Sequence, residues 1–499
     1  MGKERQERTT VNVLFIAAEA DPFVKIGGLG DVAGSLPAAI RKICAAGAAP
    51  VDVDIRLVIP YYPQLKESVG DVTPLGEYAF TSGNEQLTVQ VYQTTSRGVP
   101  VYLLDGDPIR NGGRVYSNQT DLDAEKFIFF TLACVKLPEF LHWDCQIIHA
   151  NDWHTALAPY VLKALPAFRK PKIKTILSVH NLPFLGEGCQ PCMTAYQIPP
   201  YPFGLLPSWA QHLPLPMGLS TADRIIPVSP GYAREIQTPE YGSGLEKLLQ
   251  SRARQIVGIV NGIDVDAWNP ASDSLLPHPY SSASISEKIG NKKAVLESLG
   301  MPFDPNTPLL VVISRMDYQK GIDLAVSALA NLLDISWRAI ILGSGDAAIE
   351  QKCREFAKQY PDRMQVMTGF HAELAHRLYA GADIFLMPSR YEPCGISQMI
   401  AMRYGTIPVA RATGGLKDTI QAVQPEKTGT GYLFEEASPV AFSQALKTAL
   451  ADFANRSRWQ EIQLMAMKMD FSWDASALKY IQQYVDLVRI KQPAGGRKP

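Results

Sequence analysis

The chain alternates short, uninterrupted apolar runs with longer amphipathic segments. Apolar runs in the first half are VNVLFIAA, IRLVIP, CQIIHA, KTILSVH, DRIIPVS and QIVGIVNG; those in the second half are PLLVVISR, RAIILG, RMQVMTG, ADIFLMPS and GTIPVAR. A run of Val, Ile and Leu without polar alternation is typical of a parallel strand covered on both faces. The pattern predicts an α/β fold with two doubly wound, Rossmann-like domains.

The boundary between the two series is expected within VNGIDVDAWNPASDSLLPHPYSSAS, which is rich in Asn, Pro and Ser and has no long period. We assign residues 1–263 to the first domain and 264–477 to the second. Residues 72–103 predict a β-hairpin inserted in the first domain. The segment WDASALKYIQQYVDLVRI predicts a final packing helix, and residues 493–499 are expected to form a disordered tail.

Composition narrows the class of protein. The 499 residues exceed one ordinary domain, and a content of 46% hydrophobic and 19% charged residues is typical of a soluble globular protein. The net charge of -1 and the scattered basic residues argue against a nucleic-acid partner. No segment reaches the roughly 18 apolar residues of a membrane span. The amino-terminal segment also lacks the apolar core of a secretory signal.

Cysteine usage points to a reducing compartment. The seven cysteines are dispersed, as expected of a cytoplasmic protein. Cys189 and Cys192 form one CxxC, but no second pair or histidine cluster follows at ligand spacing. We therefore expect no metal site.

Polar residues, and in one case a glycine, follow many of the predicted strands. They are Glu19, His149, His180, Ser229 and Asn261 in the first half, and Arg315, Gly343 and Ser389 in the second. Ligands of open α/β sheets bind outside the carboxyl ends of the strands. Two domains that face each other by these ends would enclose a deep cleft.

The stretch GGLGDVAG, from Gly27 to Gly34, superficially matches a dinucleotide-binding fingerprint through Gly28, Gly30 and Gly34. The preceding strand ends near Glu19, however, and about eight residues separate it from the glycines, too many for that motif. One interpretation is a set of backbone amides that, with Lys25, binds phosphate or a sugar hydroxyl. A purely structural turn is the alternative.

Two motifs of the second half carry charge beyond buried strands. In SRMDYQKG, Arg315 and Lys320 can converge on one diphosphate, although a solvated pair is the alternative. In PSRYEPCGISQ, Glu392 can hold sugar hydroxyls next to a helix start, or simply cap that helix. Cys394 has no partner for nucleophilic catalysis and is more typical of a buried thiol.

HANDWHTAL and SVHNLPFLG place Asp152, His154 and His180 after parallel strands, so we expect them at one cleft. No serine elbow accompanies them, which argues against a hydrolase triad. A structural role for either histidine is the alternative.

Together these motifs resemble bacterial glycogen synthases and plant starch synthases, from about Val13 to about Tyr484. KIGGLGDV, HNLPFLG, VSPGYAREIQTPEYGSGLE, SRMDYQKG, PSRYEPCGISQ and GTIPVARATGGLKDT are each similar to family segments. The resemblance implies a glycosyltransferase of the GT-B type. It would transfer glucose from ADP-glucose to the non-reducing end of an α-1,4-glucan (glycogen, starch or a maltooligosaccharide) with retention of configuration. It would need no metal or other cofactor, and helix 478–492 would pack back on the first domain.

The resemblance also implies site residues. Catalytic roles fall to Lys25, His180, Arg315, Lys320 and Glu392. Substrate-binding roles fall to Gly27, Gly28, Asp31, Asp152, Asn261, Phe370, Cys394, Gly395, Ile396 and Ser397. Phe370 stands where the family usually has a tyrosine that stacks on adenine.

The sequence departs from the family in a few places. Ile26 replaces a common threonine, Gly30 a common alanine, and residues 182–220 are unusually proline-rich. Ile400 stands where other retaining transferases carry a second acid. A nicotinamide-dependent oxidoreductase and a non-catalytic glucan-binding protein fit less well. A transferase with another donor, such as UDP-glucose, stays open, as do the natural acceptor, processivity and oligomeric state.

Overall fold

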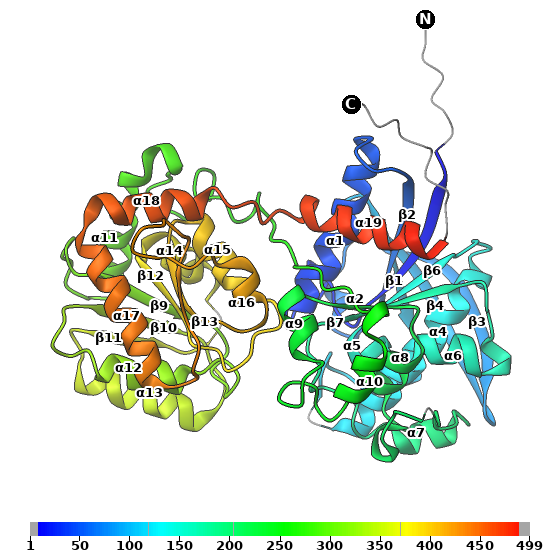
Figure 1. Cartoon of the computed structure of the whole chain (residues 1–499). Helices are drawn as coiled ribbons and strands as arrows, with labels where there is room; N and C mark the ends of the chain where they lie inside the picture. The colour runs from blue at the N-terminus through cyan, green and yellow to red at the C-terminus, as the bar shows by residue number, and fades with distance from the viewer. Residues whose placement is uncertain (1–7, 118, 203, 370, 489–499) are drawn as a thin grey trace, which may run out of the picture. The chain divides into compact units, whose positions relative to one another are not determined.

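The computed structural model describes residues 8–117, 119–202, 204–369 and 371–488. The chain divides into two compact units: Met1–Gly262 with Trp473–Pro499, and Ile263–Ser472. Each unit is an α/β domain built on one sheet (Figure 1). The predicted fold class is therefore confirmed.

The first unit contains an eight-stranded sheet in the order β3-β4-β5-β2-β1-β6-β7-β8. Its strands are β1 (Thr10–Ile16), β2 (Asp52–Pro60), β3 (Thr73–Ser82), β4 (Glu85–Ser96), β5 (Val99–Asp105), β6 (Ile147–Asn151), β7 (Lys174–Val179) and β8 (Arg224–Pro227). The six neighbouring strands β5-β2-β1-β6-β7-β8 pair in parallel. The hairpin predicted within residues 72–103 corresponds to β4 and β5, which pair antiparallel. β3, which was not predicted as a separate strand, pairs antiparallel with β4 at the edge of the sheet.

Helices connect and cover these strands. They are α1 (Gly28–Ala45), α2 (Leu65–Ser68), α3 (Asp107–Asn111), α4 (Thr120–Phe140), α5 (Asp152–Thr155), α6 (Ala158–Ala164), α7 (Gln190–Ala195), α8 (Pro214–Thr221), α9 (Pro230–Glu235), α10 (Glu246–Ser251) and α19 (Trp473–Val488). Short 3-10 turns lie at Pro166–Phe168, Ser208–Ala210 and Ala253–Gln255.

The second unit contains a six-stranded, wholly parallel sheet in the order β11-β10-β9-β12-β13-β14. Its strands are β9 (Leu309–Ile313), β10 (Arg338–Leu342), β11 (Met364–Met367), β12 (Ile384–Met387), β13 (Ile407–Arg411) and β14 (Tyr432–Phe434). Its helices are α11 (Lys288–Ser298), α12 (Ile322–Ala330), α13 (Ala347–Gln359), α14 (Ala372–Gly381), α15 (Ser397–Arg403), α16 (Gly414–Thr419), α17 (Pro439–Ala454) and α18 (Arg456–Met467), after a 3-10 turn at Ser282–Glu287.

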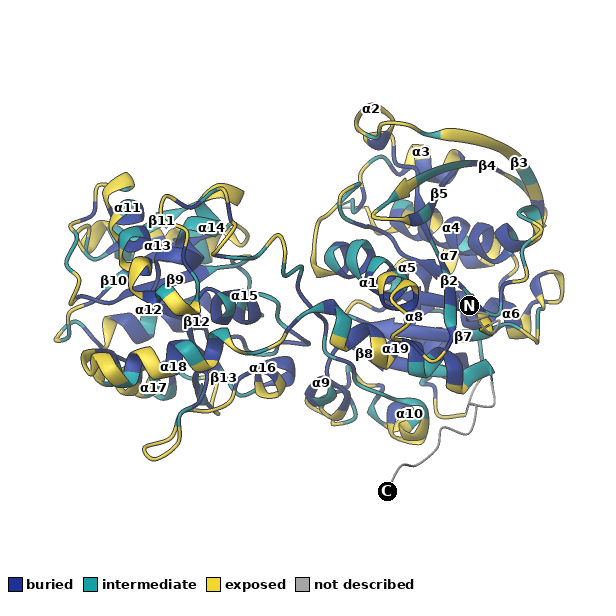
Figure 2. Ribbon diagram, turned by 90° about the horizontal axis from the view of Figure 1, so that it is seen from above, coloured by how far each residue is buried: buried dark blue, intermediate teal, exposed yellow. Residues whose placement is uncertain are grey.

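The apolar runs form the strands of both units except QIVGIVNG, which forms only an isolated bridge between Ile256 and Ile225. In Figure 2 the inner strands are dark blue, whereas the β3–β4 hairpin carries exposed residues. In β1, for example, Val13 to Ile16 are fully buried. Burial on both faces explains why these strands lack polar alternation. Within the described residues, no helix has the length and apolarity needed to cross a membrane.

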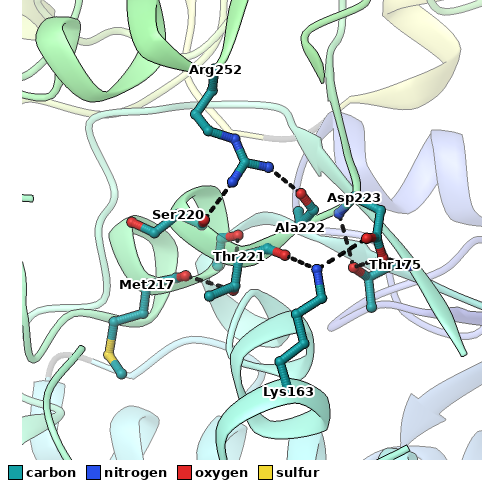
Figure 3. Close-up of polar contacts among 9 residues, drawn as sticks. Lys163, Thr175, Met217, Ser220, Thr221, Ala222, Asp223 and Arg252 are labelled. Carbon is teal, nitrogen blue, oxygen red and sulfur yellow. Dashed lines mark hydrogen bonds and ion pairs between the residues drawn. The ribbon is translucent and has the colours of Figure 1, made fainter. Parts of the chain in front are cut away.

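The lysine and arginine cluster in Figure 3 secures the segment that leads into β8. Lys163 donates to the carbonyl of Thr221, and Arg252 donates to those of Ser220 and Ala222. These carbonyls end α8, where cations are favoured by the helix dipole. Asp223 then accepts the Thr175 N–H at 2.8 Å, which joins the amino ends of β7 and β8.

The last helix belongs to the first unit over its whole described length. α19 begins at Trp473 and lies along α1 (Figure 1). Our sequence boundary placed 473–477 in the second domain. Ser476 instead donates to the Val260 carbonyl at 2.6 Å, a long-range contact invisible in the local pattern. Residues 493–499, predicted to be disordered, lie outside the described residues.

The apolar spacing of Leu478, Ile481 and Val485 predicts only part of the buried face of α19, since Ile481 and Val485 are buried. Leu478 is exposed, whereas Tyr480, Ile481 and Tyr484 are fully buried. The Tyr484 hydroxyl lies 2.9 Å from Nδ1 of His149 on β6, and the His149 Nε2 lies 2.8 Å from the Ser178 hydroxyl. Burial lowers the pKa of His149 to about 3, so this ring is neutral. His149 is thus structural, and Tyr480 and Tyr484 pack against its ring between α19 and β6.

We expect Tyr484→Phe to lower the free energy of unfolding by about 1–3 kcal/mol, because a buried ring nitrogen of His149 loses its partner. Urea denaturation followed by circular dichroism measures this change. Lys479→Ala, on the exposed face of the same helix, is the control and should change stability little. Equal stability of the two variants would contradict the structural role of His149.

Candidate active site

The predicted site residues follow strands at the topological switch point of each sheet, where the strand order reverses. In the first unit β1 lies between β2 and β6, and in the second β9 lies between β10 and β12. Chain segments diverge at such points and leave a crevice where ligands bind. Lys25 and Asp152 follow β1 and β6, while Lys320 and Glu392 follow β9 and β12. Each unit therefore carries candidate site residues at its own switch point.

The Lys25 loop joins β1 to α1. Lys25 Nζ lies 2.5 Å from Asp31 Oδ1, and both side chains are partly exposed. Burial raises the pKa of Asp31, and the Lys25 charge opposes this shift. Gly27 caps α1 in an extended conformation, so the loop ends at the positive end of an 18-residue helix.

Not every amide of this loop is available to a ligand. The N–H groups of Ile26 and Gly27 donate to the carboxylate of Glu19, and the Gly30 N–H donates to the Gly27 carbonyl at 3.2 Å. The Gly28 amide makes no hydrogen bond within the described residues. Of the two glycines predicted to contact the donor, only Gly28 therefore has an amide without an acceptor in the described part of the chain.

Asp152 organises the chain that leaves β7. Its backbone is left-handed, with φ +51, a conformation that aspartate tolerates better than most residues. Its Oδ1 accepts the N–H of His180 at 2.6 Å and of Asn181 at 3.3 Å. Burial raises the pKa of Asp152 to about 7, although these hydrogen bonds oppose the shift.

The His180 ring has a defined tautomer. Asn151 donates its amide nitrogen to the Ile16 carbonyl at 3.1 Å, so its Oδ1 faces His180 Nε2 at 3.0 Å. The Nε2 atom therefore carries the proton, and Nδ1 keeps its lone pair. Burial lowers the pKa of His180 to about 4. His180 is thus a neutral acceptor near pH 7.

Among the buried polar atoms without a hydrogen-bond partner in the described part of the chain, three belong to candidate site residues of the first unit or to their chain neighbours. They are His154 Nδ1, Asn181 Oδ1 and Asn261 Oδ1. Such atoms are rare in native interiors, and a ligand or water often completes them. His154 packs against Phe127 and Trp153, and burial lowers its pKa to about 3. That environment favours its structural alternative, whereas Asn181 follows the site residue His180 directly.

The second unit brings Lys320 and Glu392 together. Lys320 Nζ lies 2.6 Å from Glu392 Oε2, with side-chain exposures of 18% and 5%. The Ser389 hydroxyl donates to the same oxygen at 3.0 Å. Glu392 Oε2 is therefore occupied by a cation and a hydroxyl at the switch point. A cation and a carboxylate thus lie side by side.

Arg315 has a different environment. It is 61% exposed and pairs with Asp317 Oδ2 at 3.0 Å. Asp317 also accepts the Lys320 N–H at 3.0 Å, which orders the turn before α12. The exposed guanidinium is accessible to an anionic ligand, for which Arg supplies a fork of donors.

The segment from Cys394 to Ser397 leads into α15. Cys394 is buried, as its structural alternative predicted, and Gly395 has φ +73, which favours glycine. The Gln398 amide donates to the carbonyls of Cys394 and Gly395. A Cβ on Gly415 would lie 2.4 Å from the Cys394 Cα, so this glycine lets the start of α16 approach that of α15. Gly415 was absent from the predicted set.

The structure thus joins Lys25 to Asp31, Asp152 to His180, and Lys320 to Glu392. It describes no contact that links Asn261 to these groups, and Phe370 lies outside the described residues. Glu19 and Asn151 were not predicted as site residues. Glu19 was noticed only as a polar residue beyond a strand, and Asn151 directly precedes the predicted Asp152.

Known proteins resemble both units. Residues 12–251 match the family model described as the starch synthase catalytic domain, and residues 301–463 match glycosyl transferases group 1. A glycogen synthase of Anaeromyxobacter sp. is 39% identical, covering 96% of this chain and 99% of its own. A glycogen synthase of Streptococcus gordonii is 38% identical, covering 96% and 100%.

A solved structure matches at the level of the whole chain. The catalytic domain of starch synthase IV from Arabidopsis thaliana, bound to ADP and acarbose, has a TM-score of 0.85 at 28% identity, covering 97% of this chain and 100% of that one. This agreement extends the sequence similarity to the GT-B architecture. The chain therefore belongs to the family of bacterial glycogen synthases and plant starch synthases, and it is a glycosyltransferase.

Proposed function

We propose that the enzyme transfers glucose from ADP-glucose to the 4-hydroxyl at the non-reducing end of an α-1,4-glucan, with retention of anomeric configuration. The observation that carries this proposal is the Lys320–Glu392 pair at a switch point, 2.6 Å apart. It offers a cation for a diphosphate and an acid for sugar hydroxyls. The match to a starch synthase bound to ADP and acarbose supports the same substrate classes.

In this proposal the second unit stabilises the leaving group. Arg315 and Lys320 neutralise the charge that develops on the departing diphosphate, and the backbone of Gly395 to Ser397 contacts its phosphates. Glu392 accepts hydrogen bonds from glucose hydroxyls through its second oxygen. These cations replace the charge that a metal ion would supply, so we propose no metal or cofactor.

The first unit acts on the sugar and the acceptor. Lys25 and the Gly28 amide meet the donor, and Asp31 holds Lys25 in place. His180, neutral and fixed through Asn151, accepts a sugar hydroxyl at Nδ1. Asp152 and Asn261 contribute polar groups on the glucose or acceptor side.

Retention follows from a reaction on one face of the sugar. Retaining glycosidases use a carboxylate nucleophile. Here we propose that the glycosidic bond to the diphosphate breaks first and yields an oxocarbenium-like state. The glucan hydroxyl then attacks from the same face, and the leaving diphosphate accepts its proton. Glycogen, starch and maltooligosaccharides are the proposed acceptors.

We also propose that the enzyme acts in the cytoplasm. All seven cysteines are free thiols, and six of them are buried. Thiols in this number persist in reducing compartments.

A radiolabel assay tests the proposed function. Purified enzyme is incubated with glycogen or maltooligosaccharides and labelled ADP-glucose or UDP-glucose, before and after EDTA dialysis. We expect labelled glucan from ADP-glucose, an α-linkage by proton NMR, and kcat within twofold after EDTA. Faster transfer from UDP-glucose would favour the alternative donor, a β-linkage would contradict retention, and loss of activity restored by Mg²⁺ would contradict the metal-free mechanism.

A further inference from the structure

Glu19 is a buried carboxylate beneath the Lys25 loop. It lies three residues beyond β1 and is 2% exposed. Its Oε2 accepts the N–H groups of Ile26 and Gly27, the latter at 3.1 Å, and its Oε1 accepts the Tyr116 hydroxyl at 3.0 Å. In the described part of the chain no cation pairs with it. Its charge is therefore held by hydrogen bonds from neutral groups.

The loop has few other means of keeping its shape. Residues 25–28 are all exposed, and the Ile26 side chain is 60% exposed, so apolar burial does not fix them. Two hydrogen bonds lie within the loop, Val24 N–H to the Ala20 carbonyl and Asp21 N–H to the Gly30 carbonyl, each at 3.0 Å. Arg97 also donates to Asp21 Oδ2 at 3.0 Å, which holds the start of the loop but not residues 25–28. The Glu19 carboxylate connects the peptide groups of Ile26 and Gly27 to the interior of the unit.

These bonds also select which amides remain accessible. The first amides of a helix have no intrahelical acceptor and attract anions. Glu19 occupies the amides of Ile26 and Gly27, just before α1 begins at Gly28. Without Glu19, the four successive amides of residues 26 to 29 would all be open to a donor phosphate, and nothing would fix which of them it binds. With Glu19 in place, it meets the Gly28 and Leu29 amides and the Lys25 ammonium.

We infer that Glu19 is a positioning residue for glucosyl transfer, because its carboxylate fixes the Lys25 loop and selects the amides offered to the donor. The inference rests on the donor role that the proposed function gives to this loop. A group that acts by positioning should lower kcat when removed, since small displacements at a reacting centre cost large factors. It should also change the motion of the loop in the free enzyme.

The test compares Glu19→Ala and Glu19→Gln by steady-state kinetics and by hydrogen–deuterium exchange of residues 20–30 without substrate. In Glu19→Ala we expect exchange at residues 26 and 27 to quicken at least tenfold and kcat to fall about 100-fold. The KM for glucan should stay within twofold. Glu19→Gln retains one acceptor oxygen, so both properties should be partly restored, and this variant remains informative if Glu19→Ala does not fold.

Asp223→Asn is the matched control. Asp223 accepts the Thr175 N–H at the amino ends of β7 and β8 (Figure 3), whereas the site follows their carboxyl ends. We expect it to lose stability and to keep kcat. Unchanged exchange at residues 26 and 27 in Glu19→Ala, or a raised glucan KM with normal kcat, would overturn the positioning role. Normal turnover in Lys25→Ala would instead remove the donor role of the loop, so the two failures are distinct.

Discussion

Lys320→Ala is expected to lower kcat with ADP-glucose by about 10²–10³-fold, the factor typical of losing one preorganised charge-stabilising group. Lys320 Nζ lies 2.6 Å from Glu392 Oε2 at the end of the segment that follows β9. Its side chain is only 18% exposed, so its charge is weakly screened by solvent. Initial rates at saturating glycogen, with ADP-glucose varied, measure the effect.

The same pair predicts a specific pattern for stability. Removing one member of a nearly buried ion pair leaves the other charge desolvated and unpaired, which is strongly destabilising. Lys320→Ala and Glu392→Ala should each lower the thermal midpoint, whereas the double variant should be less destabilised than their sum. Activity should not follow stability: we expect the double variant to be as inactive as Glu392→Ala. This contrast separates the structural from the catalytic contribution of Lys320.

Arg354→Ala is the control for the loss of a cation in the second unit. Arg354 lies 2.6 Å from Glu350 on α13, and its side chain is 47% exposed. Exposed pairs of this kind contribute about 0–1 kcal/mol. We expect wild-type kcat and a nearly unchanged thermal midpoint. Wild-type turnover in Lys320→Ala, measured beside this control, would refute the proposed role of Lys320 at the diphosphate.

The sequence predicts the fold well because its strands are buried on both faces. Runs such as VNVLFIAA and PLLVVISR coincide with β1 and β9, and neighbouring runs pair with them in parallel. Residues beyond these strands were therefore assigned to one edge of each sheet. Lys25, Lys320 and Glu392 follow from this rule together with their motifs.

Other features depend on contacts between distant segments. Glu19 looks like any acid beyond a strand, and only the folded loop brings the amides of Ile26 and Gly27 onto it. Asn151 fixes His180 across two adjacent strands. The first turn of α19 carries no apolar period and is held by the Val260 carbonyl. Local periodicity contains none of this information.

Asp152→Asn is expected to reduce kcat about 100-fold and to remove a pH dependence near neutrality. Burial raises the pKa of Asp152 to about 7, so its ionised form grows as the pH rises through this value. Asp152 is proposed to lie on the glucose or acceptor side, and we expect its carboxylate to stabilise the positive charge of the oxocarbenium-like state. Wild-type kcat should therefore rise between pH 6 and 8. His180, with a pKa lowered to about 4, stays neutral across this range.

The free energy that Asp152 contributes to folding should fall as the pH rises, whereas kcat should rise. The ordinary pKa of an aspartate, 3.8, is below the folded value of about 7, so the folded state binds the proton more tightly than the unfolded chain. The contribution of Asp152 to the free energy of unfolding of the wild type is fully present below about pH 4. It declines by about 1.4 kcal/mol per pH unit up to about pH 7. Asn cannot ionise, so Asp152→Asn should gain stability relative to wild type over this window.

Urea denaturation at intervals from pH 4 to pH 8 measures that difference, and rate profiles on the same samples measure kcat. The groups that act on Asp152 are Glu19, which raises its pKa, and the amides of His180 and Asn181, which lower it. Asp105→Asn removes another buried carboxylate, which accepts the Gly106 N–H at 2.8 Å, and should keep the wild-type rate profile. Parallel stability curves for wild type and Asp152→Asn would mean that Asp152 ionises as freely when folded as when unfolded. Its carboxylate would then be charged throughout this range, and the rise in kcat would have to come from another group.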